Sequence, residues 1–578
     1  MFPVLTNCPL LLASLCLLGV IFSPLAAQGQ EPRTWRPRPA HHPLRTPDEP
    51  PRSTLTCDAP IDPQGLTADE IRAVAETGAA ALSGAYSVAV TDRAGRILAV
   101  WQKPGSSLED AERAVALART GAFFSNDQAP LSSRTVRFIS QKNFPPGVDF
   151  LPNGALYGIE NTNRGCSFNR AFNPGQCVPR ATSLSALRRR NNVDGICNPA
   201  DPGCDLLRCD GDQQDGCGLG IFTGKFQDVQ AGSVQFTAEE ALDSFPQRVH
   251  GGGIPIFKDC RLVGGVGVFG GGAAADEFAA LAASQPGLPG LGVSGCLLPP
   301  FAVFLDGIRL PFVEFTSPPP GTSPGSLEGG FLALDQDAGG DPVFIRESRA
   351  AAEDWLIGGP GLTEDGMLLS ASEVERIVEQ SIAGANETRA AIRLPLGSRT
   401  RMVIAVADLD GRILALFRMS DATVFSIDVA VAKARNMIYF SGPDRTASDL
   451  PGVPAGTAVT SRTISFGSQP FYPVGITGSA PGPFFELYLN DLTNPCSQGA
   501  DPSTGVNGIV FFPGSVPLYK DGVLVGGLGI SGDGVEQDDV VAAAGAAGFE
   551  APFDLRADLV FVRGVRLPYL KFNRNPDK

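Results

Sequence analysis

One histidine and two arginines are the first candidates for binding a ligand or acting in catalysis. His250 is the one histidine outside the leader that precedes the first expected domain, and an imidazole can ligate a metal or act as a general base near neutral pH. It directly precedes a Gly-Gly-Gly turn, so an ordinary loop residue is the alternative interpretation. Arg134 and Arg462 each lie within Ser-Arg-Thr and could bind a carboxylate through two parallel N–H groups, or form a structural ion pair.

A glycine-rich turn before the last expected helix carries a second polar set. The turn reads Gly-Ile-Ser-Gly-Asp-Gly from position 529, and it supplies Ser531, Glu536 and Gln537. Glycines there would let backbone N–H groups approach an anion at a helix N-terminus. The alternative is a tight turn with a helix cap and no ligand. The corresponding turn of the first half has Phe and Ala at these three positions, so the two halves would not act alike.

An acidic loop between two cysteines is the one candidate for a metal site. Cys209-Asp-Gly-Asp-Gln-Gln-Asp-Gly-Cys217 places Asp210, Asp212 and Asp215 at spacings that could hold Ca²⁺ through carboxylate oxygens. No Glu stands at the twelfth position that a complete calcium loop requires. A disulfide-stapled acidic loop without metal is therefore the alternative.

Enzyme motifs are scarce. No His-Glu-x-x-His helix and no phosphate-binding P-loop occurs in the sequence. Gly-x-Gly-x-x-Gly occurs at 265–270 and 527–532, but each follows the second arm of an expected hairpin rather than opening a parallel βαβ unit. Whether the chain is an enzyme is left open, and a dinucleotide site is disfavoured.

An internal repeat determines which elements position these residues. Val88-Ala-Val-Thr-Asp-Arg-Ala-Gly-Arg-Ile-Leu-Ala-Val aligns without a gap with Ile404-Ala-Val-Ala-Asp-Leu-Asp-Gly-Arg-Ile-Leu-Ala-Leu, and each predicts a β-hairpin. A capping-box spacing predicts a helix before each hairpin, and an alanine-rich helical pattern follows each one. Thr120 and Asn436 take equivalent places in that later helix and could face the same pocket. A second hairpin and a helix complete each copy.

The expected fold is α/β (α+β), with two tandem copies of a small antiparallel-sheet domain flanked by helices and carrying long loop insertions. The expected boundaries are a signal peptide at 1–27, a Pro/Arg-rich leader at 28–56, a first domain at 57–315 with a Cys-rich insertion at about 149–249, a linker at 316–366 and a second domain at 367–578.

Composition and the first residues predict export. An apolar run from Leu10 to Phe22 precedes Ala26-Ala27, which is typical of a cleaved signal, so a secreted or periplasmic location is expected. Of 12 cysteines, Cys8 and Cys16 leave with the signal, and the ten that remain favour disulfides in an oxidising compartment. The mature chain has no apolar run long enough to cross a membrane. A net charge of −15 argues against nucleic-acid binding.

The repeated blocks resemble the GlcG/HbpS-like family of haem-binding or haem-degrading proteins. The resemblance rests on Asp-x-x-Gly-Arg-Ile-Leu-Ala in the hairpin, on Lys433-Ala-Arg, and on the run from Lys520 that ends in Glu536-Gln537-Asp538. It implies antiparallel sheets of about five strands, an internal pseudo-dimer or a homo-oligomer, and a small ligand such as haem or a related tetrapyrrole, for which His250 would be an axial ligand. An enzyme acting on a small organic acid and a structural or interaction scaffold remain alternatives.

Overall fold

The computed structural model describes residues 65–163, 249–292, 303–334, 354–493 and 508–571, apart from 94, 96, 147, 151–153, 155 and 444. All of these residues belong to one unit, Pro47–Lys578. The expected signal peptide, the leader and nearly all of the Cys-rich insertion lie outside the described residues. Among the helices that are described, none is long and apolar enough to span a bilayer.

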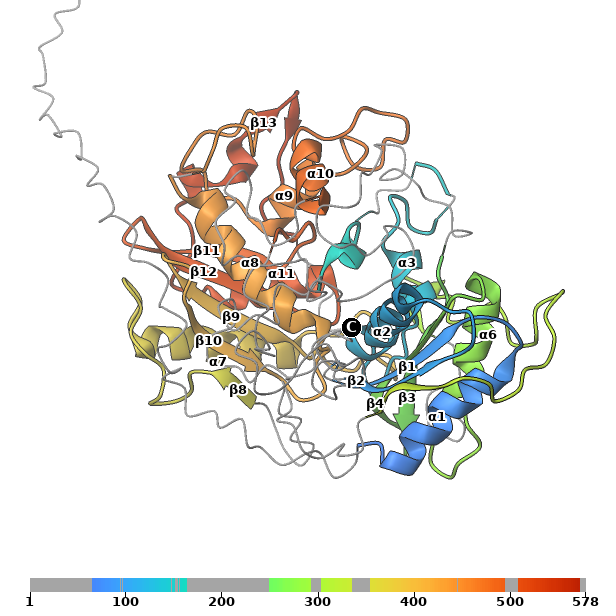
Figure 1. The fold of residues 1–578 in the computed structure, drawn as a ribbon. Helices are drawn as coiled ribbons and strands as arrows, with labels where there is room; N and C mark the ends of the chain where they lie inside the picture. Colours follow the sequence, from blue (N-terminus) through green and yellow to red (C-terminus); the bar gives the residue numbers. More distant parts are fainter. Residues whose placement is uncertain are drawn as a thin grey trace, which may run out of the picture. The chain divides into compact units, whose positions relative to one another are not determined.

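The first copy is a five-stranded antiparallel sheet with helices on both faces. Its strand order is β3-β4-β1-β2-β7, and every neighbouring pair is antiparallel. Helix α2 packs through Ala114 and Val115 on the face that carries Ala89, whereas α1 and α6 cover the opposite face, which carries Val88 (Figure 1). The elements are α1 Ala68–Ala81, β1 Ser87–Asp92, β2 Ile97–Gln102, α2 Leu108–Phe124, α3 Ser133–Ile139, η1 Ile159–Asn161, β3 Gly253–Lys258, β4 Arg261–Phe269, α6 Ala273–Ala283, β5 Phe304–Leu305, β6 Ile308–Arg309 and β7 Gly330–Leu334.

The second copy repeats this architecture, with the strand order β11-β12-β9-β10-β8. Helix α8 packs on one face of the sheet, and α7 with α11 packs on the other. Its elements are β8 Asp354–Ile357, α7 Ala371–Glu387, β9 Val403–Asp408, β10 Ile413–Arg418, α8 Phe425–Ser441, α9 Ser461–Gly467, α10 Phe485–Thr493, β11 Ser515–Lys520, β12 Val523–Ser531, α11 Val535–Gly545, η5 Phe553–Leu555, η6 Ala557–Leu559, β13 Phe561–Val562 and β14 Val565–Arg566. The predicted α/β class, hairpins and antiparallel sheets are confirmed.

The helix starts follow from local hydrogen bonding that the sequence predicts. At the start of α1 the Thr67 side chain accepts from the backbone N–H of Glu70, and the Glu70 carboxylate accepts from the N–H of Thr67. Ser370 and Glu373 form the same reciprocal pair at the start of α7. Both capping boxes satisfy N–H groups that the first helical turn leaves without partners.

The glycines of the Gly-x-Gly-x-x-Gly matches let each central helix lie directly on its sheet. A Cβ at Gly265 would lie 2.0 Å from the carbonyl oxygen of Ala118 in α2, and one at Gly267 would lie 1.9 Å from that of Ala114. In the second copy, a Cβ at Gly527 on β12 would lie 2.1 Å from the carbonyl oxygen of Ala434 in α8, and one at Gly529 would lie 2.0 Å from that of Ala430. No side chain fits between these strands and helices, so packing accounts for the motif without a nucleotide.

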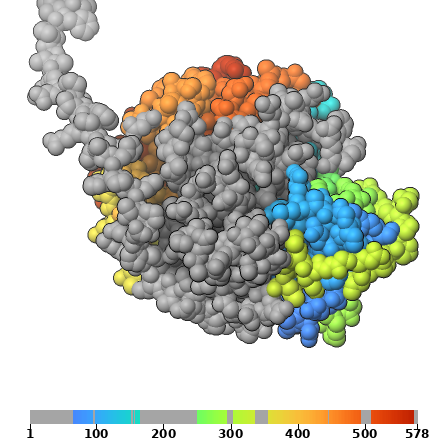
Figure 2. Space-filling model, in the orientation of Figure 1, coloured from blue at the N-terminus to red at the C-terminus, as the bar shows by residue number. Residues whose placement is uncertain are grey.

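The segment 316–366, expected to be a linker, also supplies an edge strand to each sheet. β7 pairs with β2 in the first copy, and β8 pairs with β10 in the second. Figure 2 shows the yellow-green segment that ends in β7 on the surface beside the blue elements of the first copy. The expected linker was assigned from its Pro/Gly/Ser-rich first part, whereas the short apolar run at 331–334 gains stability from hydrogen bonding to a strand distant in sequence.

Candidate ligand-binding site

A cavity of about 910 Å³ lies where the two copies meet. The first copy contributes α2, the chain after α2, and the β5–β6 turn, and the second contributes the chain after α7, the start of α8 and the β12–α11 turn. Its volume is at the upper end of the range of about 300–1,000 Å³ that is usual for small-molecule pockets. The lining residues are Phe124, Leu131, Ile139, Phe144, Gly154, Leu156, Ile159, Phe304, Leu305, Asp306, Gly307, Leu310, Arg389, Ala391, Ile392, Leu394, Leu396, Thr423, Phe425, Phe512, Ser531, Gly532, Gly534, Val535, Glu536, Gln537 and Asp538.

Aromatic side chains join the two copies at this cavity. Phe124 at the end of α2 stacks on Phe425 at the start of α8, with ring centroids 4.4 Å apart and planes 12° apart. Both rings are buried in one apolar cluster with Ile139 and Phe512. The cavity therefore has a mainly apolar wall that neither copy forms alone.

The polar end of the cavity lies at the turn between β12 and α11. Asp538, in the first turn of α11, accepts a hydrogen bond of 2.9 Å from Lys433 Nζ, and Lys433 also donates to the carbonyl of Ile530 at 2.7 Å. The ammonium lies 4.8 Å from the centroid of the Phe512 ring. Ser531 binds Ser426 at 3.1 Å. A fully buried cation from α8 thus holds a carboxylate at the cavity wall.

Burial controls the protonation of this pair. Burial raises the pKa of Asp538 to about 7 despite the opposing effect of Lys433, and burial lowers the pKa of Lys433 although Asp538 opposes that change. Asp538 Oδ2 receives the lysine, whereas its buried Oδ1 has no hydrogen-bond partner among the described residues. A buried acceptor of this kind is free to receive a hydrogen bond from a ligand.

The structure places three of the predicted binding residues at the cavity. Ser531, Glu536 and Gln537 line it, and the Glu536 carboxylate forms an ion pair with Lys571. Their role in binding a ligand stays a prediction. This turn lines a mainly apolar cavity, and its carboxylates Glu536 and Asp538 are paired with Lys571 and Lys433.

The predicted arginines are held in ion pairs within their own copies. Arg134 binds Glu277 at 2.6 Å, and Arg462 binds Asp539, with both carboxylates fully buried. Neither arginine lines the cavity. Of the two interpretations that the sequence left open, the structural ion pair describes the contacts of both residues.

Thr120 and Asn436 also serve local structure. The hydroxyl of Thr120 donates to the carbonyl of Ala116 one turn earlier in α2, at 2.9 Å. The Asn436 amide donates to the carbonyl of Gly508 and accepts from the N–H of Val510, each at 3.0 Å. Neither side chain lines this cavity.

His250 lies in the first copy, away from the cavity-lining set. Its ring stacks on Phe269 with centroids 4.5 Å apart, and its Nε2 lies 3.7 Å from Asp276 Oδ2. Burial, with the charge of Arg113, lowers the pKa of His250 to about 4, so the ring is neutral at pH 7. Asp276 is held instead by the backbone N–H groups of Gly270 and Gly271.

The Asp276 carboxyl predicts a measurable pH dependence of stability. Burial raises the pKa of Asp276 to about 7. The charge of Asp110 raises this pKa further, whereas the hydrogen bonds from backbone N–H groups lower it. His250 and Tyr86 are the other titratable groups that face the Asp276 carboxyl. A raised folded-state pKa contributes stability that is complete below about pH 4 and is lost as the pH rises through 7. We expect Asp276→Asn to reduce the loss between pH 5 and pH 8 by about 2–3 kcal/mol, since the folded-state carboxyl stays protonated over about two pH units and one pKa unit corresponds to about 1.4 kcal/mol.

Urea denaturation at both pH values measures this difference. The exposed Asp69 on α1 provides a control, Asp69→Asn, which should keep the wild-type pH dependence. An Asp276→Asn variant with an unchanged pH dependence would show that Asp276 is already ionised at pH 5.

Sequence reasoning missed Lys433, Asp538 and Arg389 as site residues. A signal for Lys433 was present, because the repeat places Leu117 at the matching position of α2, and a lysine on an otherwise buried helix needs a buried anion. Asp538 was noted only as part of a family motif. Arg389 lies in a segment that the repeat does not cover, so the sequence gave no signal for it.

The predicted calcium ligands Asp210, Asp212 and Asp215 lie outside the described residues. Within the described ranges, no group of three or more His, Cys, Asp or Glu side chains could hold a metal ion. Cys260, in the β3–β4 turn, is disulfide-bonded. The other cysteines lie outside the part of the chain that the structure describes, so the predicted disulfide network stays a prediction.

Comparisons with known proteins identify the second copy. A family model described as "Haem degrading protein HbpS-like" matches residues 370–547. The corrinoid adenosyltransferase PduO of Salmonella typhimurium strain LT2 is 28% identical over 162 residues, which span 28% of this chain and 36% of PduO. The chain thus spans about a third of the length of that curated relative.

Solved structures similar to part of the chain include a PduOC:heme complex and a double mutant of Streptomyces reticuli HbpS. The first is 22% identical and covers 32% of this chain and 98% of its own, with a TM-score of 0.21. The second is 19% identical and covers 33% of this chain and 91% of its own, with a TM-score of 0.20. The family match at residues 370–547 falls within the second copy, and this segment of the chain is thus similar to the HbpS-like family.

Proposed function

We propose that this chain is an exported small-molecule-binding protein that holds a tetrapyrrole-sized apolar ligand in the cavity between its two copies. The observation that carries the proposal is the cavity of about 910 Å³, whose apolar and aromatic wall is shared by the two copies. The HbpS-like domain supports a tetrapyrrole as the ligand class, because its family description refers to haem. The expected signal and the even number of cysteines support export.

A haem iron held by a protein side chain does not fit the cavity as described. Protein ligands of haem iron are His, Cys, Met or Tyr. None of these residue types occurs among the described residues that line the cavity, and His250 lies elsewhere, beside Phe269. The apolar wall suits the body of a tetrapyrrole, but the described donors do not suit an axially ligated iron.

The alternatives from the sequence fit the cavity less well. An enzyme acting on a small organic acid would use Arg462 with Glu536 and Gln537, yet Arg462 is paired with Asp539 and does not line the cavity. A pure scaffold would explain the ion pairs of Arg134 and Arg462 but gives no role to a large apolar cavity. Ligand binding is the function that the geometry supports best.

Titration of the purified chain with metal-free protoporphyrin IX and with haemin tests the proposal. We expect quenching of protein fluorescence and a shifted porphyrin band with a dissociation constant in the micromolar range or below. Ile392→Trp places a large ring in the cavity and should weaken binding at least tenfold. Leu559→Trp, at an exposed position, should bind as the wild type does. Absence of binding by the wild type, or equal binding by both variants, would contradict the proposal.

A further inference from the structure

The charges at the cavity are unevenly compensated. The Glu536 carboxylate is paired with Lys571, and the Asp538 carboxylate is paired with Lys433. Arg389 also lines the cavity, and its guanidinium has no ion pair or hydrogen bond with any residue that the structure describes. An arginine without an ion pair can bind an anionic group on a ligand, and a carboxylate matches its planar geometry.

A second polar feature lies at the β12–α11 turn. Asp538 is 2% exposed, and its Oδ1 has no hydrogen-bond partner within the described ranges. The backbone at Gly514 packs closely against this pair, since a Cβ there would lie 2.5 Å from the Asp538 Cβ and 2.6 Å from Lys433 Nζ. An N–H or O–H group of a ligand in the cavity could bind this oxygen, and leaving such a buried acceptor unpaired costs about 1–3 kcal/mol.

We infer that the ligand is a metal-free apolar carboxylic acid with an N–H or O–H donor, bound by its carboxylate to Arg389 and by its donor to Asp538 Oδ1. This inference rests on the proposed function and specifies its ligand class. A metal-free tetrapyrrole has both features, because its pyrrole nitrogens carry hydrogen and its side chains end in carboxylates. A metal complex would have metal in place of the ring hydrogens and would meet no side chain of an axial-ligand type at the described wall.

The carboxylate contact is tested with metal-free protoporphyrin IX and its dimethyl ester, measured against the wild type and two arginine variants. We expect the acid to bind the wild type at least tenfold more tightly than the ester. Arg389→Gln should remove that preference by weakening the acid alone. Arg399→Gln is the matched control. Arg399 is exposed and does not line the cavity, although its backbone forms an isolated antiparallel β-bridge with that of Arg389.

The donor contact is tested with Asp538→Asn, which keeps the shape of the side chain but not its charge. We expect this variant to bind the acid and the ester more weakly by a similar factor of about ten, since both keep the ring N–H groups. A urea unfolding curve for each variant confirms that it is folded before binding is compared.

The possible failures are distinguishable. If the wild type binds the acid and the ester equally, or Arg389→Gln keeps the preference for the acid, the carboxylate contact is wrong while the cavity still binds a ligand. Unchanged binding by Asp538→Asn contradicts the donor contact. If the wild type binds neither probe, the proposed function fails, and this inference fails with it.

Discussion

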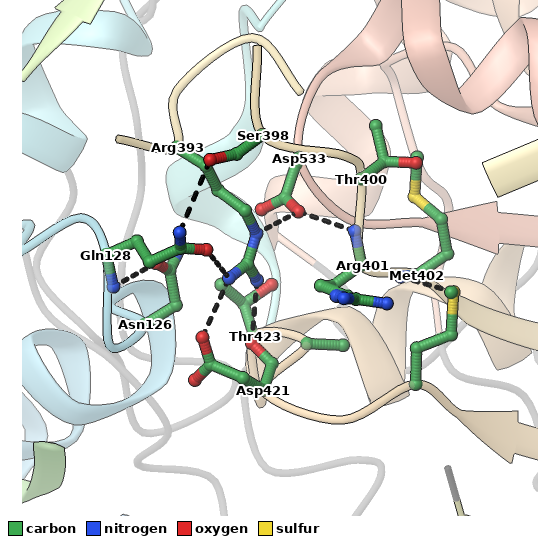
Figure 3. A network of polar contacts seen from close by, with 12 residues as sticks. Asn126, Gln128, Arg393, Ser398, Thr400, Arg401, Met402, Asp421, Thr423 and Asp533 are labelled. Atoms are coloured by element: carbon green, nitrogen blue, oxygen red, sulfur yellow. Dashed lines mark hydrogen bonds and ion pairs between the residues drawn. The ribbon is translucent and has the colours of Figure 1, made fainter. Parts of the chain in front are cut away.

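Replacing Arg393 by methionine is expected to lower the free energy of unfolding by about 3–5 kcal/mol, because it leaves buried carboxylates without their cation. The Arg393 side chain is 1% exposed and lies between Asp533, to which its Nε donates, and Asp421, which it binds at 2.7 Å (Figure 3). It also donates to Gln128 of the first copy at 3.1 Å. The substitution is therefore expected to destabilise both the fold of the second copy and its contact with the first.

This network extends across the contact between the copies. Arg93 of the first copy binds Asp421 at 2.7 Å, and the backbone N–H of Asp127 donates to the same carboxylate. Burial alone would raise the pKa of Asp421, but the two arginines outweigh it and lower that pKa to about 2. The carboxylate is thus charged at neutral pH, and losing Arg393 leaves Arg93 as its main cation.

Urea denaturation measures the effect, with Arg399→Met as the control at an exposed arginine of the same segment. The control should stay within about 0.5 kcal/mol of the wild type. Adding Asp533→Asn to Arg393→Met should recover part of the loss, because it removes the buried charge that Arg393 had compensated. A loss below about 1 kcal/mol in the single variant would show that water reaches Asp533.

Replacing Lys433 by methionine is expected to have a similar cost, about 3–5 kcal/mol at pH 8. The ammonium is fully buried and binds both Asp538 and the carbonyl of Ile530, so the variant leaves a buried carboxylate and a buried carbonyl with fewer partners. The loss should shrink below the pKa of Asp538, which lies at about 7 with Lys433 present and rises further without it. Protonation then removes the uncompensated charge.

A double-mutant cycle with Asp538→Asn measures this pair. Lys433→Met with Asp538→Asn should be more stable than Lys433→Met alone at pH 8, with a coupling energy of about 1–3 kcal/mol. Lys520→Met is the control, since Lys520 pairs with Glu373 at an exposed position and should cost below about 1 kcal/mol. Additive effects of the two substitutions would mean that Lys433 and Asp538 do not form an ion pair.

The sequence by itself determined the repeat, the order of the hairpins and their flanking helices, and the starts of α1 and α7. Hairpins and capping boxes depend on residues three to thirteen positions apart, and the repeat shows each pattern twice, so Thr67 with Glu70 and Ser370 with Glu373 were correctly predicted. The glycine-rich turn with Ser531, singled out in the sequence, lines the cavity, and the glycines of the preceding strand pack against α8.

Only the tertiary structure decided which candidate residues meet. The sequence left open whether Arg462 and Arg134 bind a ligand or form structural ion pairs, and each pairs with a buried carboxylate about 80 to 140 residues later, Asp539 and Glu277. At the cavity, Phe124 of one copy stacks on Phe425 of the other, a contact between segments about 300 residues apart. Local spacing determines helices and turns, whereas a shared cavity depends on how two folded surfaces pack, and no short-range pattern in the chain records that packing.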